Sequence, residues 1–376
     1  MSRYLFQSIV QDLQKKMVFV AGPRQVGKTH MAQKILTHFQ SDQYYNWDRR
    51  EHRQLIQKAG WDRTKKIVVL DELHKYRKWK SWLKGIYDTE KRGPFILVTG
   101  SARLDVYRRG GDSLLGRYFH YRLHPFSLKE FVLHSNLSKE EAFLRLWKRG
   151  GFPEPLLAET EFDAARWRQQ RLETVIREDL LSIEQVRQLS ALESLVDLLR
   201  ERIASPLSFQ SLAQDLEVSS PTIKAWIELL ERMYVLFRVF PYSHSLSRAI
   251  RKEVKVYFYD YSDVPNEGAR LENLIASHLL REVHYLRDLQ GQKIELRTLR
   301  DKEKREVDFV VIKDGAPIRL VEVKTSETTP TRSILYYKER FPSAVAYQVV
   351  KDLNQSHTLK GVQVVPLTQY LMSLNC

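Results

Sequence analysis

The sequence feature that most constrains the fold is an eight-residue motif that runs from Gly22 to Thr29. Its pattern is G-x-x-x-x-G-K-T, in which four residues separate two glycines and a lysine and a threonine follow. The apolar run Met17–Ala21 precedes the motif, and residues 30–38 form a helix-like run after it. A strand, a glycine-rich turn and a helix are the context in which this motif cradles phosphates. The sequence therefore predicts a nucleoside triphosphate site.

Each part of the motif has an expected role. Successive backbone N–H groups and the helix N-terminus supply positive potential for phosphate. The Lys28 ammonium should reach the β and γ phosphates, and the Thr29 hydroxyl should hold Mg²⁺. No pattern typical of a guanine site is found, so ATP is the expected nucleotide. The residues expected to bind it are Gly22, Pro23, Arg24, Gln25, Val26, Gly27, Lys28, Thr29, His30 and Asp71.

Length and charge narrow the class of protein further. A chain of 376 residues is too long for one ordinary domain, so two to four are expected. The 61 Lys and Arg residues exceed the 46 Asp and Glu residues, giving a net charge of +15. That balance favours a polyanionic partner, with nucleic acid ahead of an acidic membrane surface, although a basic solvated surface would look the same.

Cysteine usage and apolar runs bear on the compartment. The only cysteine is Cys376, so the sequence excludes an intrachain disulfide and a cysteine-based zinc site. The N-terminal residues lack the apolar core of a signal peptide, and no apolar run is long enough to span a membrane. We expect a cytoplasmic protein with no membrane partner.

The pattern of apolar residues divides the chain into four expected parts. Residues 1–125 alternate apolar strands with helix-like stretches, which is typical of a parallel α/β sheet. Residues 126–204 are almost entirely helical in pattern, residues 205–262 form a short unit, and residues 263–376 return to α/β. Strands of the first part are expected at residues 17–21, 43–46, 67–70, 95–99 and 118–123.

Two carboxylates follow the third apolar strand, residues 67–70. Asp71 and Glu72 should therefore lie at the carboxyl edge of the sheet, beside the phosphate loop. There Asp71 can complete the Mg²⁺ shell and Glu72 can polarise the attacking water. The fourth strand is followed by a polar residue, Thr99 or Ser101, that fits a γ-phosphate or water sensor and fits an ordinary turn equally well.

An arginine supplied by a neighbouring subunit would stabilise charge in the transition state. Arg117 is the candidate for this arginine finger, and Arg108 and Arg109 compete for the role. A DNA-facing or solvated arginine is the alternative. A finger supplied by a second copy implies a ring or another homo-oligomer.

These elements together resemble an AAA+ ATPase. More narrowly, three segments resemble bacterial and archaeal AAA+ ATPases with an attached C-terminal domain of undefined function: Leu114–Tyr118, His124–Phe131 and Gly150–Pro155. The resemblance covers essentially the whole chain. It implies ATP hydrolysis with Mg²⁺ in a homo-oligomer, expected to be a hexameric ring, with residues 1–125 as the ATPase core and 126–204 as a helical lid. Gly150, Gly151 and Pro153 are expected to shape a turn at that lid.

The unit at residues 205–262 resembles a winged helix. Ser208–Leu216 is an amphipathic helix, residues 217–221 are a turn, and Thr222–Leu230 is a second helix. Residues 234–240 and 255–259 look like paired wing strands. The second helix of such a motif enters the major groove of DNA, with Lys224 and Arg232 as its expected contacts. The alternative is a winged helix that packs on protein, because Glu228 and Glu231 lie on the same helix.

Residues 263–376 resemble the PD-(D/E)xK nuclease core. Glu272 lies on an expected helix, Asp308 on one strand, and Glu322 and Lys324 on the next, where positions i and i+2 share a face. Glu272, Asp308 and Glu322 could hold Mg²⁺, and Lys324 could stabilise a phosphorane. An ordinary alternation of Glu and Lys on an exposed strand is the bland alternative. A run of basic residues in the same block is suited to contact a phosphate backbone: Arg297, Arg300, Lys302, Lys304 and Arg305.

The favoured function is an AAA+ ATPase that hydrolyses ATP with Mg²⁺ to act on DNA by translocation, remodelling or branch migration. The catalytic residues expected for both sites are Glu72, Arg117, Ser101, Asp308, Glu322 and Lys324. Nuclease activity gated by ATP would be an added function. The alternative is a nucleotide-controlled protein-interaction switch, in which the nuclease-like domain is inactive and serves for docking.

Overall fold

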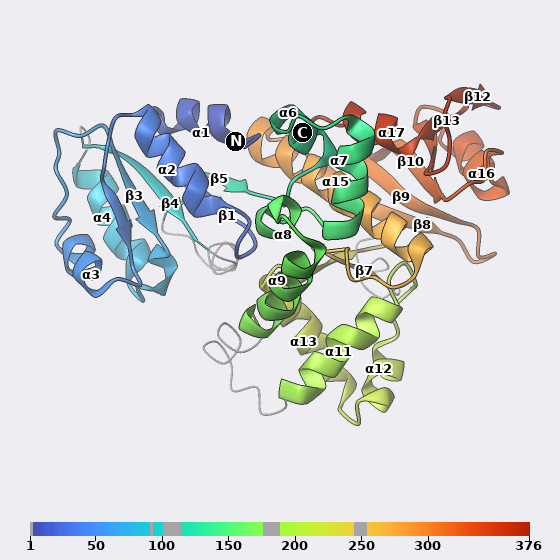
Figure 1. Cartoon of the computed structure of the whole chain (residues 1–376), viewed down its shortest axis with the longest axis horizontal. Helices are drawn as coiled ribbons and strands as arrows, with labels where there is room; N and C mark the ends of the chain where they lie inside the picture. Colours follow the sequence, from blue (N-terminus) through green and yellow to red (C-terminus); the bar gives the residue numbers. More distant parts are fainter. Residues whose placement is uncertain (1–2, 91–92, 101–113, 176–188, 244–253) are drawn as a thin grey trace. The chain divides into compact units, whose positions relative to one another are not determined.

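The computed structural model describes residues 3–90, 93–100, 114–175, 189–243 and 254–376. Its contacts divide the chain into two compact units. The first holds Met1–Pro125 and Arg232–Tyr234, and the second holds Phe126–Glu231 and Val235–Cys376. Figure 1 shows the elements of both units in the order of the chain.

The first unit is built on a five-stranded sheet in the order β2-β3-β4-β1-β5. Every pair in it is parallel. The strands are β1 (Met17–Ala21), β2 (Tyr44–Asn46), β3 (Ile67–Asp71), β4 (Phe95–Thr99) and β5 (Tyr118–Arg122). The predicted parallel α/β class is therefore confirmed for this part of the chain.

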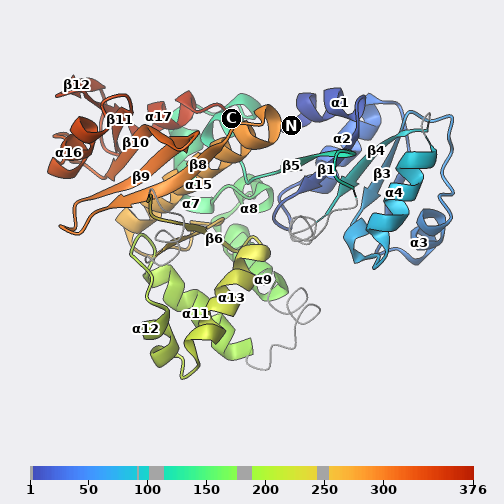
Figure 2. The same cartoon turned by 180° about the vertical axis from the view of Figure 1, so that it is seen from behind.

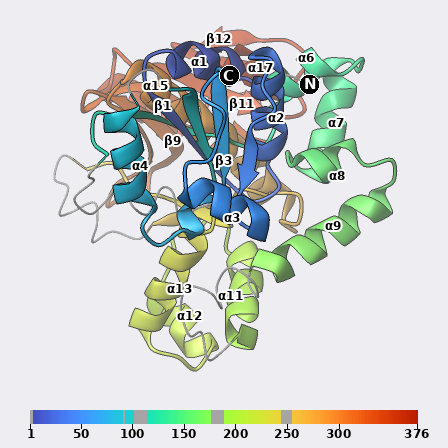
Figure 3. The same ribbon diagram turned by 90° about the vertical axis from the view of Figure 1, so that its left-hand side faces the viewer.

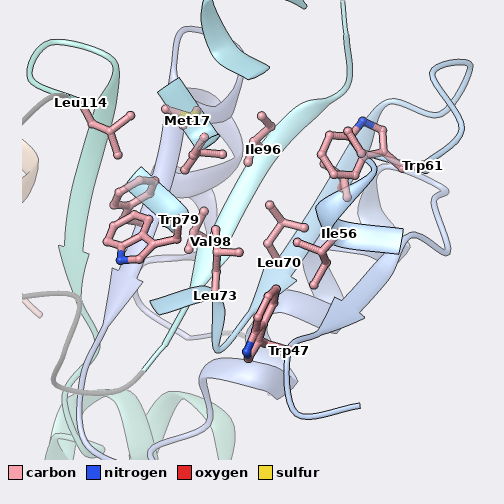
Figure 4. Packing of buried hydrophobic residues seen from close by; sticks show 14 of the residues in the cluster. Met17, Trp47, Ile56, Trp61, Leu70, Leu73, Trp79, Ile96, Val98 and Leu114 are labelled. Carbon is pink, nitrogen blue, oxygen red and sulfur yellow. The ribbon is translucent and has the colours of Figure 1, made fainter. Parts of the chain in front are cut away.

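Helices cover both faces of this sheet, so β1 and β3 are buried at every position. On one face, α1 (Phe6–Leu13) and α2 (Lys28–His38) contact β1, β3 and β4. On the other, Trp79 and Leu83 of α4 (Trp79–Thr89) and Ile56 of α3 (Arg50–Gln57) pack with alternate strand residues. Figure 4 shows this cluster, with Val98 and Leu70 between Trp79 and Ile56. A short 3₁₀ turn, Leu73–Lys75, follows β3.

The second unit begins with helices, which Figure 3 shows as a green run. They are α6 (Leu128–His134), α7 (Lys139–Arg149), α8 (Pro153–Leu157), α9 (Glu161–Thr174) and α11 (Leu189–Glu201). Helix α7 starts at a capping box, in which Ser138 and Glu141 satisfy each other's backbone N–H groups. It ends at Gly150, whose φ is 73° and where a Cβ would lie 2.5 Å from an Asp260 carboxylate oxygen. Only glycine fits that turn.

A helix-turn-helix and a strand pair come next. Helices α12 (Phe209–Asp215) and α13 (Ser220–Arg232) precede the antiparallel strands β6 (Leu236–Val239) and β7 (Lys255–Phe258). Helix α13 starts at Ser220, inside the segment predicted to be a turn. That prediction was wrong because Pro221 lies in the first helical turn, where a missing N–H costs no hydrogen bond. The winged-helix assignment itself stays a prediction.

The chain ends in a separate mixed sheet in the order β12-β13-β11-β10-β9-β8, drawn in orange and red in Figure 2. Strands β8, β9 and β10 form an antiparallel meander, and β10, β11 and β13 run parallel. The C-terminal α/β prediction is therefore confirmed. The elements are α15 (Glu267–Gln290), β8 (Ile294–Arg300), β9 (Glu306–Lys313), β10 (Ala316–Lys324), α16 (Arg332–Arg340), β11 (Val345–Val350), β12 (His357–Leu359), β13 (Val362–Pro366) and α17 (Leu367–Ser373). Among the described residues, no helix is both long and apolar enough to cross a membrane.

Candidate functional site

The phosphate loop leaves β1 at the carboxyl edge of the first sheet and enters α2. Gly22 has a φ of 151°, and a Cβ there would lie 2.4 Å from the Leu123 carbonyl oxygen. Gly27 is the N-cap of α2 with a φ of 96°, a left-handed conformation that favours glycine. No side chain caps this helix start. Its first N–H groups therefore point out of the helix without a side-chain acceptor, as an anion site requires.

The lysine of the motif lies folded inside this loop. Lys28 is only 7% exposed, and its ammonium donates to the carbonyl oxygens of Gly22, at 2.9 Å, and Pro23, at 2.6 Å. Backbone carbonyls are neutral partners, so a phosphate oxygen would be a stronger acceptor for the same ammonium. The loop holds its cation where a phosphate would need it.

Asp71 is the hub of the polar contacts beside the loop. Thr29 donates its hydroxyl proton to one Asp71 carboxylate oxygen at 3.0 Å. The hydroxyls of Tyr44 and Thr99, from the two neighbouring strands, each approach Asp71 at 2.5 Å. Strand register explains the cluster, since Asn46 and Thr99 lie directly opposite Asp71. A hydroxyl beside a carboxylate is an oxygen pair that suits Mg²⁺, so the residues fit the predicted ion.

Tyr44 was not among the residues predicted for this site. It lies on β2, and burial, followed by its contacts with Asp71, raises the pKa of its hydroxyl to about 12. The hydroxyl therefore stays protonated and serves as a fixed donor to Asp71. A strand of three residues gave little sequence signal, although its place beside β3 follows from the topology.

Glu72 adopts an unusual backbone conformation, with a φ of 56°. Its N–H donates to the Thr99 carbonyl at 2.9 Å, which fixes the turn after β3. Its carboxylate lies 3.4 Å from the Lys75 ammonium and 3.6 Å from the His74 ring. Burial raises the pKa of Glu72, and Lys28 and Lys75 oppose that rise. A strained, partly buried carboxylate next to the loop is suited to act on a water molecule.

Arg117 lies at the opposite edge of the sheet from the loop. It precedes β5, where Tyr118 pairs with Met17 at the start of β1, whereas the loop follows Ala21 at the end of β1. Its guanidinium forms two bonds with Asp88, Nε to Oδ1 at 2.8 Å and Nη2 to Oδ2 at 3.1 Å. Arg117 therefore cannot serve the loop of its own subunit. Ser101, Arg108 and Arg109 lie outside the described residues.

Arg3 is a second residue that the sequence did not single out. It is buried, and its guanidinium donates to the carbonyl oxygens of Val26, at 2.6 Å, and His124, at 2.5 Å. These contacts join the phosphate loop to the segment that follows β5. A lone arginine near the start of a chain carries no motif, so only the folded structure reveals this role.

The four residues of the predicted nuclease-like core come together in the second unit. Asp308 on β9 accepts a hydrogen bond from the Val323 N–H of β10 at 2.8 Å. The Lys324 ammonium lies 3.1 Å from Glu322, its neighbour on the same face. Burial raises the pKa of Asp308, and burial together with Asp308 raises the pKa of Glu322 and of Glu272 on α15. The constellation is a partly buried cluster and not an exposed alternation.

Lys255, the first residue of β7, was missed by the sequence analysis and lies inside this cluster. Its ammonium is 3.0 Å from a Glu272 oxygen and 2.5 Å from a Glu306 oxygen. Tyr257, two positions along β7, donates its hydroxyl proton to the same Glu272 oxygen at 2.6 Å. Within the ranges that the structure describes, no three His, Cys, Asp or Glu side chains are grouped to hold a metal. The predicted Mg²⁺ ligands Glu272, Asp308 and Glu322 are thus near one another without forming such a group.

The expected DNA-contacting residues fall into paired and exposed sets. On α13, Lys224 and Arg232 are exposed, and Arg238 of β6 pairs with Glu231 at 2.6 Å and Glu228 at 3.8 Å. Arg238 therefore offsets the acidic residues of that helix.

The basic run near β8 is largely self-neutralised. Arg297 pairs with Glu295 at 2.5 Å, and Arg305 pairs with Asp301 at 2.6 Å. Arg300 lies 3.6 Å from Glu306. Arg300, Lys302 and Lys304 are exposed.

A glycine-rich loop on a parallel sheet, with its threonine bonded to the strand-end aspartate, defines the class: a P-loop nucleotide-binding domain. The family comparison agrees, because residues 14–132 match the AAA domain family. Residues 140–262 match a domain of unknown function (DUF8612), and residues 267–370 match another (DUF4143). The chain thus contains an AAA domain and a DUF4143 C-terminal domain.

The relatives found are uncharacterized proteins. One from Methanocaldococcus jannaschii is 26% identical over 223 residues, covering 51% of this chain and 46% of the relative. The match thus spans less than half of that relative's length. A second from the same organism is 22% identical over 88% of this chain and 80% of its own length. One from Haemophilus influenzae is 22% identical over 87% of this chain and 84% of its own.

Two solved structures show distant likeness. A variant of Thermotoga maritima RuvB has 16% identity and a TM-score of 0.33, covering 62% of this chain and 87% of that chain. Aeropyrum pernix ORC1, solved in complex with DNA, has 13% identity and a TM-score of 0.35, covering 73% of this chain and 91% of that chain. TM-scores this low carry no argument about function or assembly.

Proposed function

We propose that the chain hydrolyses ATP at the phosphate loop and uses the cycle to act on DNA. The observation that carries the first half is the Lys28, Thr29 and Asp71 arrangement at the loop. The AAA domain match over residues 14–132 supports it.

The residues divide the chemistry among them. The Lys28 ammonium exchanges two carbonyl partners for the β and γ phosphates, and the open start of α2 receives phosphate oxygens. Thr29 and Asp71 hold Mg²⁺, which neutralises charge that develops on the phosphates. Glu72 orients and polarises the attacking water, and its raised pKa makes it a better base than an ordinary carboxylate. Thr99 and Tyr44 keep Asp71 in place.

The ATPase acts as a homo-oligomer, with a hexameric ring as the expected form. Arg117 lies on the sheet edge away from its own loop, which is the placement needed for a guanidinium that serves a second copy. Asp88 holds that guanidinium in the single chain through two hydrogen bonds. In the assembly the γ-phosphate of the neighbour replaces Asp88.

DNA is the proposed substrate of the cycle, by translocation, remodelling or branch migration. The net charge of +15 supports a polyanionic partner. The winged-helix and C-terminal segments offer exposed basic side chains to phosphates, among them Lys224, Arg232, Lys302 and Lys304.

The test is ATP turnover with Mg²⁺, measured alone and with single-stranded, duplex and four-way-branched DNA. Several-fold stimulation by at least one DNA, falling steeply with salt, is expected. Lys28→Ala controls for contaminating activity, and Lys58→Ala, an exposed lysine outside the loop, is the matched control that should leave turnover unchanged. Turnover that every DNA leaves unchanged would remove the DNA half of the proposal.

A nucleotide-controlled protein-interaction switch is the second candidate. The observation that favours it is the pairing of Arg297, Arg300 and Arg305 with nearby carboxylates, which neutralises three cations of the basic run. This function predicts turnover that is indifferent to DNA and responsive to a protein partner. DNA cleavage at Asp308, Glu322 and Lys324 is not added to either candidate, because the described residues group no metal-binding set there.

A further inference from the structure

The carboxylate cluster of the C-terminal sheet contains cations of its own. Glu272 comes from α15, Glu306 and Asp308 from β9, and Glu322 from β10. Two lysines enter the cluster from different strands: Lys324 from β10 and Lys255 from β7. Lys324 belongs to the motif expected of a nuclease. Lys255 does not, and it is the more deeply buried, with a side chain 5% exposed.

A buried ammonium persists only when carboxylates compensate the loss of water. Burial alone would lower the pKa of Lys255, but Glu272, Asp308 and Glu306 together raise it. Two of them touch the ammonium, at 3.0 Å for Glu272 and 2.5 Å for Glu306. Lys255 is therefore held by two carboxylates, and it occupies the side of the cluster that Glu272 would offer to a metal.

The geometry points to Lys255 as the resident cation of this site: the C-terminal domain binds no divalent metal at Asp308 and Glu322 and cleaves no nucleic acid by a metal-dependent route. Mg²⁺ requires about six oxygen ligands at close range and gives up water reluctantly. The Glu272 oxygen that would serve it already accepts from Lys255 and from Tyr257. A divalent ion placed beside Asp308 would also be repelled by an ammonium that cannot leave the protein interior.

One carboxylate oxygen of the cluster is left over by these contacts. The second oxygen of Glu322 is buried without a hydrogen-bond partner. The ammonium of Lys324 lies 3.1 Å from the other oxygen of Glu322, so this carboxylate already has a cation beside it.

The role of Lys255 is then to join elements rather than to support chemistry. It starts β7, and its two ion pairs tie that strand to α15 and β9. Tyr257 adds a third tie from the same strand. A nuclease-like constellation thus becomes the anchor of the β6–β7 pair on the C-terminal sheet.

The test is Mn²⁺ titration calorimetry on the full nucleotide-free chain, repeated with Asp308→Asn. Wild type should show no binding that Asp308→Asn removes; heat common to both belongs to the phosphate loop. Lys255→Met should create an Asp308-dependent Mn²⁺ site and raise the thermal midpoint by about 5 °C at a saturating Mn²⁺ concentration. Lys255→Arg keeps the cation and should create no site.

Should Lys255→Met fail to fold, Lys255→Met/Glu272→Gln removes one charge of each sign and is expected to fold, again with an Mn²⁺ site that wild type lacks. One Mn²⁺ bound per wild-type chain and lost in Asp308→Asn would overturn the inference. Failure of Lys255→Met and of the double variant to gain any Mn²⁺ binding would overturn it as well. Neither result depends on whether the phosphate loop hydrolyses ATP.

Discussion

Asp71 in the first unit is buried and Asp308 in the second is partly buried, and both lie on strands, yet their surroundings have opposite character. Asp71 is held by hydroxyls, from Thr29, Tyr44 and Thr99, while Lys28 is held by carbonyl oxygens. Around Asp308, carboxylates are held by ammonium groups. At the first site, the two carbonyl oxygens that accept from Lys28 and the hydroxyls that donate to Asp71 are neutral groups, which a charged ligand can replace. At the second site, the ammonium groups and carboxylates neutralise one another, which closes the site to a ligand. The contact partners of these residues, and not the residue types, therefore distinguish a binding site from a structural ion-pair cluster.

The largest expected effect is the loss of ATP turnover when the loop lysine is removed, and an active variant without it would contradict the comparison. Lys28→Ala removes the ammonium that neutral carbonyls hold ready, so ATP turnover should fall by about 1,000-fold, equivalent to about 4 kcal/mol. The unfolding midpoint should move less than it does for Lys255, because the two hydrogen bonds of Lys28 go to neutral carbonyl oxygens and not to carboxylates. Steady-state turnover and a thermal melt measure the two effects. A large loss of stability with turnover retained would reverse the assignment of the two regions.

Lys255 should behave in the opposite manner. Lys255→Met leaves Glu272 and Glu306 without their buried ammonium, and breaking such a pair costs about 3–5 kcal/mol of unfolding free energy. Urea denaturation of the full chain measures the loss. Lys324→Met is the matched control, because that lysine is 28% exposed and should cost less. Equal losses from both substitutions would show that depth of burial does not separate the two lysines.

The smallest expected effect is a pH dependence that belongs to the second region. Burial and Asp308 raise the pKa of Glu322 from 4.5 to about 8, so the folded state holds this proton more tightly than the unfolded chain does. Its contribution to stability is full below pH 4.5 and is lost as the pH rises toward 8, by up to about 1.4 kcal/mol per pH unit. Unfolding free energies at pH 6 and 7 should show this fall in wild type and a smaller one in Glu322→Gln. An unchanged slope in the variant would assign the titration to another group.

Local patterns predicted the parts of the molecule that depend on neighbours in sequence. The phosphate loop follows from two glycines whose conformations a side chain would strain, and α2 follows directly from it. The C-terminal α/β block was also predictable, because residues i and i+2 of β10 must share a face. The wrong start of α13 has a local cause too, since Pro221 can end or begin a helix and the sequence does not say which.

Residues whose roles arise from distant partners were missed. Arg3 contacts His124, 121 positions away in the chain. Lys255 contacts Glu306, from which α15 and β8 separate it in the chain. Tyr44 reaches Asp71 only because β2 lies beside β3. Each is a common residue in an ordinary sequence context, and no spacing rule distinguishes it. The nuclease-like motif is complete in the sequence, but the Lys255 ammonium lies where Glu272 would otherwise offer its oxygen to a metal. A complete motif therefore does not establish an open metal site.

Arg3 has a mechanical consequence for the first unit. One guanidinium holds both Val26, inside the phosphate loop, and His124, just after the last strand of the sheet. A loop that tightens around a nucleotide must either carry His124 with it or give up a charge-assisted hydrogen bond. The arginine therefore couples the position of the phosphate loop to the segment where the chain leaves the first sheet.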